Sequence, residues 1–267
     1  MPTIDDTLME RSINSGWRRS VTATCSSSAP GLVVGIDFGT TFSGVAFANS
    51  SIALQNVCLD AKYQNQLDAV VEKITVIKTW PNGNQQYAEK TPTILSYTDD
   101  GKPVGWGGQV KHNHSIKISH FKLGLQEDTT KLYRDKNAPL FGGFLSDPNW
   151  KHPALPSKTA LDYATDYLAL IGDYVVNEVL TNRFGDEFLK NQQINFVVTV
   201  PAIWSDQAKS LTRQAAERAG IPTDKLTLVT EPEAAALYCM TTCQEVDLRP
   251  GDYFMVCDAG GGTVVCP

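Results

Sequence analysis

Apolar and polar positions alternate in blocks that predict strands through the first half of the chain. Residues 32–36 form a short apolar run of the kind found in buried strands. A polar turn that contains glycine follows at residues 37–41, and residues 42–48 are again mostly apolar. Two such runs joined by a short turn predict a hairpin. We expect the ordered part of the chain to begin with this pair.

Two further strand signals follow this hairpin. Residues 73–80 alternate between apolar and polar and end at a Pro-Asn-Gly-Asn turn, which predicts a strand. Residues 93–97 and 102–106 flank an Asp-Asp-Gly turn, which predicts a second hairpin. Residues 107–156 show no clear period, so the pattern assigns no element there.

The period of the apolar positions changes in the second half of the chain. Between residues 157 and 190 they fall three and four apart on one stripe, which predicts a long helix. Residues 194–200 are largely apolar and predict a strand. Ser205 is a suitable N-cap for a helix that we expect to end at Gly220.

Three more elements complete the pattern. Residues 226–229 predict a strand, Pro232 opens an alanine-rich helix in its first turn, and residues 252–257 predict a last strand. Because strands alternate with helices here, the sequence favours an α/β fold. Residues 1–30 are polar and rich in Ser and Thr, and we expect a disordered tail there.

Composition and charge narrow the classes of function. Hydrophobic residues make up 42% of the 267 residues, which is enough for a sizeable core. The formal net charge of -6 argues against a nucleic-acid partner, and the lack of a basic run argues against a membrane partner. The six cysteines are scattered and favour free thiols in a reducing compartment. We expect a cytoplasmic protein, with the nucleus as the alternative.

A repeated pattern carries the candidate chemistry. Residues 33–41 and 254–263 each contain an apolar run, an aspartate (Asp37 and Asp258), a glycine turn and a threonine. A glycine turn lets successive backbone N–H groups approach phosphate oxygens, and an aspartate at a strand end can hold Mg²⁺ through water. Each turn alone also fits an ordinary tight turn. The pair predicts two facing lobes that hold a nucleotide and its metal.

Four segments, in order, resemble the motifs of the seventy-kilodalton heat-shock chaperone family. They are residues 35–43, 198–204, 231–236 and 258–263. The first and last are similar to the two phosphate loops of that family, the second to its connecting segment, and the third to its Glu-Pro-x-Ala-Ala-Ala motif. The divergent sequence between the motifs is more similar to the atypical eukaryotic branch of the family than to the typical stress chaperones.

This resemblance implies an α/β fold of the actin-like ATPase (ribonuclease H-like) class. It places residues 31–250 in lobe I and residues 251–267 at the start of lobe II, of which the chain would have only the first strand and the phosphate loop. It implies ATP or ADP and Mg²⁺ as cofactors, and ATP hydrolysis that drives a peptide-binding cycle in the stress response. Co-chaperones and client polypeptides would be partners of a longer form.

The resemblance also implies roles for individual residues. Asp37 and Asp258 would hold Mg²⁺ through water, and Glu231 would orient the attacking water. Lys122 is the candidate for the catalytic lysine beside the γ-phosphate, with Lys117 as the alternative, and a solvated lysine is the other interpretation of Lys122. The residues implied to bind the nucleotide phosphates are Gly39, Thr40, Thr41, Phe42, Gly260, Gly261, Gly262 and Thr263.

The end of the sequence departs from the family pattern. After Thr263 the chain reads Val-Val-Cys-Pro, where the family has an apolar residue followed by aspartate. We therefore expect a truncated product that lacks the rest of lobe II. A fragment without nucleotide turnover, acting as an interaction module, is then an alternative to an ATPase. Another actin-fold kinase is a third interpretation, although the Glu231-Pro232 motif favours the chaperone.

Overall fold

The central element of the fold is β1 (Leu32–Asp37), which has a neighbouring strand on both sides. The computed structural model describes residues 31–49, 74–81, 88–126, 151–242, 252–260 and 264–265. The predicted tail at residues 1–30 lies outside this range. Within this range, β1 pairs antiparallel with β2 (Phe42–Asn49) and parallel with β8 (Ile194–Val200). The first strand that the structure describes is therefore an inner strand of the sheet.

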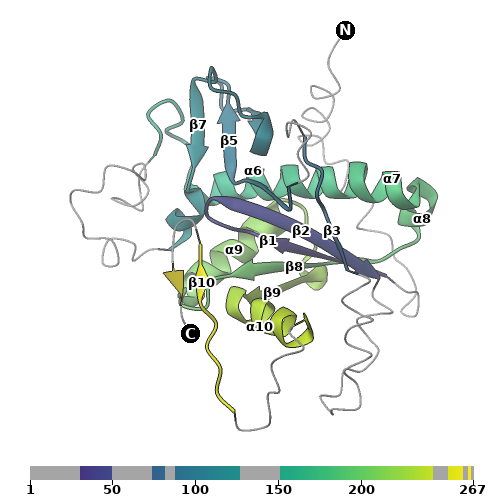
Figure 1. Cartoon of the computed structure of the whole chain (residues 1–267). Helices are drawn as coiled ribbons and strands as arrows, with labels where there is room; N and C mark the ends of the chain where they lie inside the picture. Colours follow the sequence, from purple (N-terminus) through teal and green to yellow (C-terminus); the bar gives the residue numbers. More distant parts are fainter. Residues whose placement is uncertain are drawn as a thin grey trace.

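A six-stranded sheet is built around β1 (Figure 1), with the order β3-β2-β1-β8-β9 and with β4 also paired to β2. Here β3 is Thr75–Val76, β4 is Lys90–Pro92 and β9 is Leu226–Thr230. Because β1, β8 and β9 run parallel, their carboxyl ends meet at one edge of the sheet. The turn after β1 lies at this edge.

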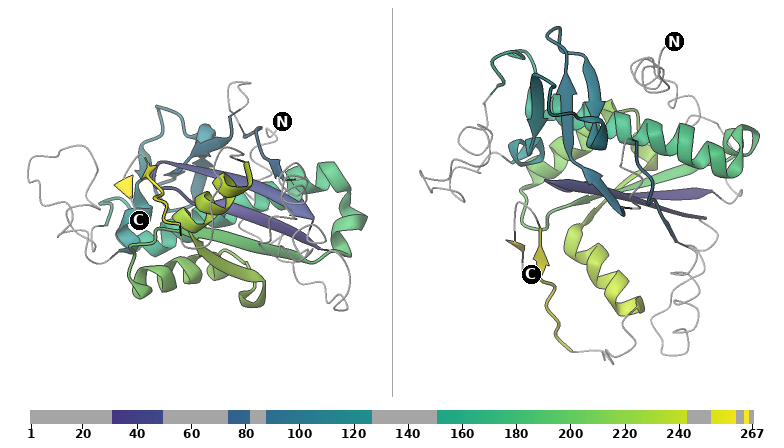
Figure 2. Two further views of the ribbon diagram at one scale, coloured as in Figure 1. Left: turned by 60° about the horizontal axis from the view of Figure 1, so that its bottom comes forward. Right: turned by 45° about the horizontal axis from the view of Figure 1, so that its top comes forward.

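Helices cover both faces of this sheet. One face is covered by α6 (Ala160–Asp173) and α9 (Asp206–Arg218), and the other by α10 (Glu231–Thr242), as Figure 2 shows. The predicted helix at residues 157–190 is confirmed in kind but is not one regular helix. A π-helix (Tyr174–Leu180) and α7 (Thr181–Phe184) continue α6, and α8 (Asp186–Lys190) follows after Gly185, whose φ of 83° ends the run.

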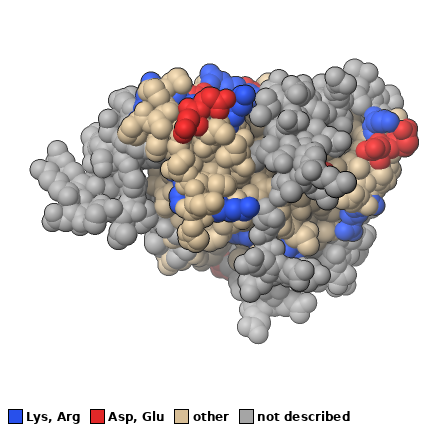
Figure 3. Space-filling view, turned by 90° about the horizontal axis from the view of Figure 1, so that it is seen from above, with Lys and Arg blue, Asp and Glu red and all other residues tan. Residues whose placement is uncertain are grey.

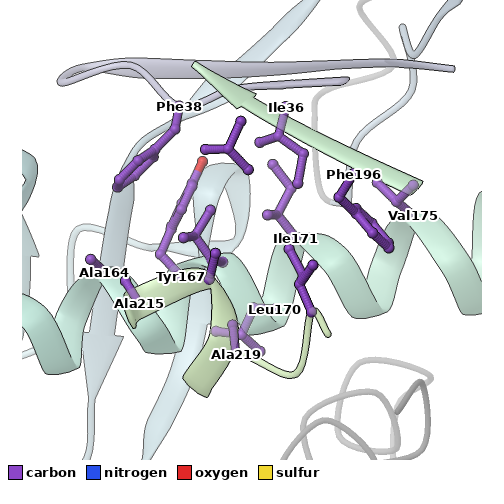
Figure 4. Close-up of a cluster of buried hydrophobic side chains, with 14 of the residues drawn as sticks. Ile36, Phe38, Ala164, Tyr167, Leu170, Ile171, Val175, Phe196, Ala215 and Ala219 are labelled. Atoms are coloured by element: carbon purple, nitrogen blue, oxygen red, sulfur yellow. The ribbon is translucent and has the colours of Figure 1, made fainter. Parts of the chain in front are cut away.

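The core lies between the sheet and the helices α6 and α9. Figure 4 shows side chains of β1, β8, α6 and α9 pointing toward one another. Phe38, which directly follows β1, is fully buried and stacks on Tyr167 of α6 with ring centroids 6.1 Å apart. Ala215 and Ala219 let α9 approach α6 closely, because their side chains are small. The turn after β1 is therefore anchored by a buried aromatic residue.

A second, three-stranded sheet packs near the start of α6, with the order β6-β5-β7. Its strands are β5 (Ile94–Tyr97), β6 (Pro103–Trp106) and β7 (Ile116–Ser119). A short 3-10 helix, η2 (Gly107–Gln109), follows β6, and another, η3 (Phe121–Leu125), follows β7 and packs on α6. A third, η6 (Thr223–Lys225), leads into β9.

Most of the predicted elements are confirmed. The two hairpins are present, β8 has the predicted bounds, the N-cap of α9 is Ser205, and Gly220 adopts a φ of 108° where the helix was expected to end. The strand expected over residues 73–80 is much shorter, since only Thr75–Val76 pairs with β2.

The prediction of a strand over residues 252–257 is wrong. The structure has no strand there; instead the short strands β10 (Asp258–Ala259) and β11 (Val264–Val265) pair only with each other among the described residues. Tyr253 is 100% exposed and Met255 72% exposed. An apolar run forms a stable strand only when neighbouring strands pair with it and cover its side chains, and no strand among the described residues pairs with residues 252–257.

Candidate functional site

The turn between β1 and β2 is too tight for any residue but glycine at position 39. A Cβ built on Gly39 would collide with the carbonyl oxygen of Phe42. The N–H of Gly39 donates to the hydroxyl of Ser43 at 3.3 Å, and that hydroxyl lies 2.8 Å from the hydroxyl of Thr93. Within the described residues, the N–H groups of Thr40 and Thr41 donate to no protein acceptor. The turn therefore presents two free donors to an anion.

Asp37, at the end of β1, has one partner for each carboxylate oxygen. The hydroxyl of Thr199 in β8 donates to Oδ1 at 3.1 Å, and Nζ of Lys90 in β4 donates to Oδ2 at 2.7 Å. Thr199 also accepts a hydrogen bond from the N–H of Phe38 at 3.2 Å, so it ties the turn to the neighbouring strand. The side chain of Asp37 is 41% exposed, which leaves room for water and ions.

Lys122 is buried at the base of this turn, in η3. Its side chain is only 2% exposed, and its Nζ donates to the carbonyl oxygen of Phe38 and, at 2.6 Å, to Oε1 of Glu231. The rings of Phe38 and Trp204 lie 5.4 and 5.3 Å from the Nζ, which adds cation–π attraction. The interpretation of Lys122 as a solvated lysine is therefore wrong. Lys117, the alternative, is exposed and donates to the backbone of His112.

Glu231 is placed by the first turn of α10. The hydroxyl of Thr230 accepts from the N–H of Glu233 at 3.4 Å, and the carboxylate of Glu233 accepts from the N–H and hydroxyl of Thr230 at 3.0 and 2.6 Å. This reciprocal arrangement is a capping box. The hydrogen bonds from Thr230 lower the pKa of the Glu233 carboxyl. With the helix start fixed, Glu231 at the first helical position faces Lys122.

The second glycine turn is only partly within the described residues. Gly261, Gly262 and Thr263 lie outside them, and so does the side chain of Asp258, whereas Gly260 is exposed. In Figures 1 and 2 the pair β10–β11, drawn in yellow, lies at the edge of the main sheet where β1 and β8 end. The approach of Asp258 to Asp37 stays a prediction.

No group of three or more potential metal ligands occurs among the parts of the chain that the structure describes. No helix in those parts is long and apolar enough to cross a membrane. On the face in Figure 3, some basic and acidic side chains lie together in small groups, and other basic side chains lie singly among tan residues.

The sequence patterns missed three residues of this site. Lys90, Thr199 and Ser43 bind Asp37 or its turn, yet Lys90 and Asp37 are 53 positions apart and Thr199 and Asp37 are 162 apart. Their positions depend on strand order and register. Two of them lie in segments similar to the family's motifs, Ser43 in the first phosphate loop and Thr199 in the connecting segment, but the resemblance gave neither of them a role.

Comparison with known proteins identifies the family to which the chain is similar. Residues 33–266 match the family model described as "Hsp70 protein". The chain is 30% identical to human heat shock 70 kDa protein 12A over 216 residues, which are 78% of this chain and 28% of that protein. It is 28% identical to human heat shock 70 kDa protein 12B over the same length and coverage.

A mitochondrial relative also matches. The chain is 24% identical to the yeast (Saccharomyces cerevisiae) heat shock protein SSC3 over 250 residues, which cover 92% of this chain and 32% of that protein. The chain thus spans about a third or less of the length of the curated relatives it matches. The mixed α/β structure is consistent with the actin-like ATPase fold.

The resemblance found in the four motifs is confirmed, including its atypical branch, since the 12A and 12B proteins are among the relatives. The chain belongs to the Hsp70 family and corresponds to part of its N-terminal nucleotide-binding region.

Proposed function

We propose that this part of the chain binds ATP or ADP with Mg²⁺ and takes part in ATP hydrolysis, as a nucleotide-binding module of an Hsp70-type chaperone. One observation carries the proposal. The Nζ of Lys122 contacts both the carbonyl oxygen of Phe38 and the carboxylate of Glu231. It therefore joins the first phosphate loop, the candidate catalytic lysine and the Glu-Pro motif in one place, although these segments are far apart in sequence.

The residues of the first turn fit the phosphates of a nucleotide. Gly39 keeps the turn narrow, and the N–H groups of Thr40 and Thr41 are free among the described residues. Free N–H groups in a tight turn bind phosphate oxygens. Asp37 keeps an exposed carboxylate beside them, a suitable acceptor for water molecules around Mg²⁺. The metal would neutralise charge that develops on the phosphates.

Lys122 and Glu231 supply the positioned charges that phosphoryl transfer requires. The chemistry depends mainly on positioning and on stabilising charge. Burial and two acceptors hold the Nζ of Lys122 in place, so its positive charge is oriented without reorganisation. The carboxylate of Glu231, 16% exposed, is reachable by water and can accept a hydrogen bond from it. We assign Glu231 to orient the attacking water.

The division into lobes belongs to the same proposal. The hairpin β1–β2, the parallel strands β8 and β9 and the helices α6, α9 and α10 support residues 31–250 as lobe I, with residues 251–267 at the start of lobe II. Asp258, Gly260, Gly261, Gly262 and Thr263 would complete the phosphate site from there. Co-chaperones, client polypeptides and a cytoplasmic location stay predictions of the whole-protein function.

Calorimetric titration of MgATP tests the proposal. We expect binding heat for the natural chain and at least tenfold weaker binding, equal to about 1.4 kcal/mol, for Asp37→Asn and for Lys122→Met. Lys117→Met is the matched control, because Lys117 is an exposed lysine close in sequence, and it should bind MgATP like the natural chain.

Glu231→Gln separates binding from hydrolysis. This variant keeps the shape of the side chain but removes its charge, so single-turnover hydrolysis should fall more than MgATP affinity does. Circular dichroism of each variant checks the fold. Absence of binding heat for the natural chain with MgATP in large excess would reject nucleotide binding by this chain.

A further inference from the structure

A row of three residues crosses the sheet beside the proposed phosphate site. Gly44 in β2 is in register with Asp37 in β1 on one side and with Lys90 in β4 on the other. Side chains of residues in register on neighbouring strands point to the same face. Asp37 and Lys90 therefore face the same side of the sheet, separated by one strand at a position that has no side chain.

Gly44 is the reason why Lys90 can reach Asp37. A Cβ built on Gly44 would lie 3.3 Å from Cγ and 3.8 Å from Cε of Lys90. The stem of the lysine thus passes over the bare backbone of Gly44, and its Nζ ends 2.7 Å from Oδ2 of Asp37. The neighbouring acid, Glu89, does not compete for it, because Glu89 pairs with Lys78 at 2.9 Å.

The Lys90–Asp37 pair differs from the Lys122–Glu231 pair in its exposure. The side chains of Lys90 and Asp37 are 54% and 41% exposed, against 2% and 16% for Lys122 and Glu231. An exposed ion pair is weak and exchanges readily with ions and water. Lys90 therefore occupies the carboxylate oxygen without being locked onto it, whereas Lys122 is fixed.

We propose that Lys90 is a competing cation at the carboxylate of Asp37. It takes the oxygen that the water shell of Mg²⁺ would otherwise use, and it supplies part of the metal's positive charge beside the phosphates. The inference rests on the proposed function, which assigns Asp37 to the metal. As a consequence, Mg²⁺ should increase the nucleotide affinity of this chain less than it increases the affinity of a chain without Lys90.

Titration with Mn²⁺ in the absence of nucleotide tests the competition directly. Mn²⁺ prefers carboxylate and water ligands as Mg²⁺ does, and it broadens nearby amide signals. We expect Lys90→Met to lower the Kd for broadening at Thr40 and Thr41 by up to about fivefold, the range for exposed ion pairs. Gly44→Ala, which crowds both the lysine stem and the carbonyl oxygen of Glu89 but keeps the charge of Lys90, should act in the same direction. An unchanged or higher Kd in Lys90→Met overturns the proposal.

Lys102→Met is the matched control for the loss of a surface charge. Lys102 also pairs with an aspartate, Asp100, at 3.3 Å and is 69% exposed, but it lies in the turn between β5 and β6. This variant should leave the Mn²⁺ Kd unchanged. In an Asp37→Asn background, Lys90→Met should no longer change the Mn²⁺ Kd, because the carboxylate for which Lys90 and the metal compete is gone.

Calorimetry with ATP separates this inference from the proposed function. The ratio of the Kd in EDTA to the Kd in Mg²⁺ should be larger in Lys90→Met than in the natural chain. An equal or smaller ratio contradicts the role of Lys90 although nucleotide binding stands. If no chain gives binding heat, the proposed function fails, and the Mn²⁺ titration still decides whether Lys90 competes for Asp37.

Discussion

Two segments of the chain run from an apolar stretch into an aspartate and a glycine turn, and their surroundings differ. In the first, β1 alternates between buried and half-buried residues and has paired strands on both sides. In the second, residues 252–257 form no strand, and β10 has two residues. Ile36 before Asp37 is 1% exposed, whereas Cys257 before Asp258 is exposed.

The difference shows what a phosphate-loop motif requires from the rest of the fold. The first turn is held by Thr199 from β8, by Ser43 and Thr93 beside it, and by the burial of Phe38 beneath it. These residues come from distant parts of the chain. The sequence pattern indicates which atoms we propose to bind phosphate, while neighbouring strands hold those atoms in place.

The largest effect on stability should come from replacing Ile36, the residue before Asp37, with alanine. Cys257, the residue before Asp258, is its counterpart in the second segment. Ile36→Ala leaves a cavity in the core and should lower the free energy of unfolding by about 2–5 kcal/mol. Cys257→Ala should change it by less than about 0.5 kcal/mol, because the thiol is exposed. Urea unfolding followed by circular dichroism measures both values. Equal losses would break the comparison between the two segments.

A smaller effect is expected when the first turn is crowded. Gly39→Ala pushes a methyl group into the carbonyl oxygen of Phe42, so the turn must shift at a cost of about 1–3 kcal/mol. MgATP affinity should fall as well. Gly35→Ala is the control inside β1, because its added Cβ would meet only Ala46 at an ordinary 3.8 Å. If the two variants bind MgATP equally, the shape of the turn does not matter for binding.

Removing the link between the first turn and β8 should have a still more moderate effect. Thr199→Val keeps the shape of the side chain but deprives Asp37 of a donor and the N–H of Phe38 of its acceptor. We expect a loss of about 1–2 kcal/mol in unfolding free energy, measured by thermal or urea unfolding. Thr227→Val on β9 is the control, since its side chain is exposed. A loss of the same size in the control would contradict the anchoring role of Thr199.

The smallest effect on stability concerns two buried tyrosines that contact each other, Tyr97 of β5 and Tyr163 of α6. Burial is the main cause that raises the pKa of Tyr97, and it raises that of Tyr163 to about 12. Each tyrosine ionises near pH 10.0 in the unfolded chain and at a higher pH in the folded chain, so its contribution to stability is complete below pH 10.0 and is lost as the pH rises above it. Each tyrosine should add a slope of up to about 1.4 kcal/mol per pH unit there.

Tyr97→Phe isolates one of these contributions. Urea unfolding from pH 8 to pH 11 should show a shallower alkaline loss of stability in this variant than in the natural chain, because one ionisable group fewer is buried. Asp166, which accepts from Tyr97, keeps its pair with Lys158 at 2.7 Å. An identical alkaline slope in both chains would show that Tyr97 ionises alike in the folded and unfolded states.

Local patterns were sufficient for most elements of the first segment and for its helices. The period of the apolar positions depends only on residues close in sequence, and so do the start of α9 at Ser205 and its end at Gly220. These elements could therefore be predicted from the sequence. The burial of Lys122 could not, because it follows from the packing of η3 against α6 and from Glu231, 109 positions away. The contact of Lys90 with Asp37 depends on the register of β4 on β2, which no periodicity encodes.

The prediction for residues 252–257 failed for a related reason. Their apolar composition is that of a buried strand, but composition does not show which strands will pair with it. In the described residues β10 pairs with β11 alone. A strand signal therefore has to be weighed together with the partners that the fold can offer.

The most direct measurement of the central claim follows backbone amide signals of the isotopically labelled chain while MgATP is added. We expect the largest shifts at Gly39, Thr40 and Thr41, whose N–H groups lie in the turn beside Lys122, and smaller shifts elsewhere. Shifts confined to another part of the surface, such as the groove of about 460 Å³ lined by Lys78, Tyr174 and Arg183, with the turn unaffected, would contradict it.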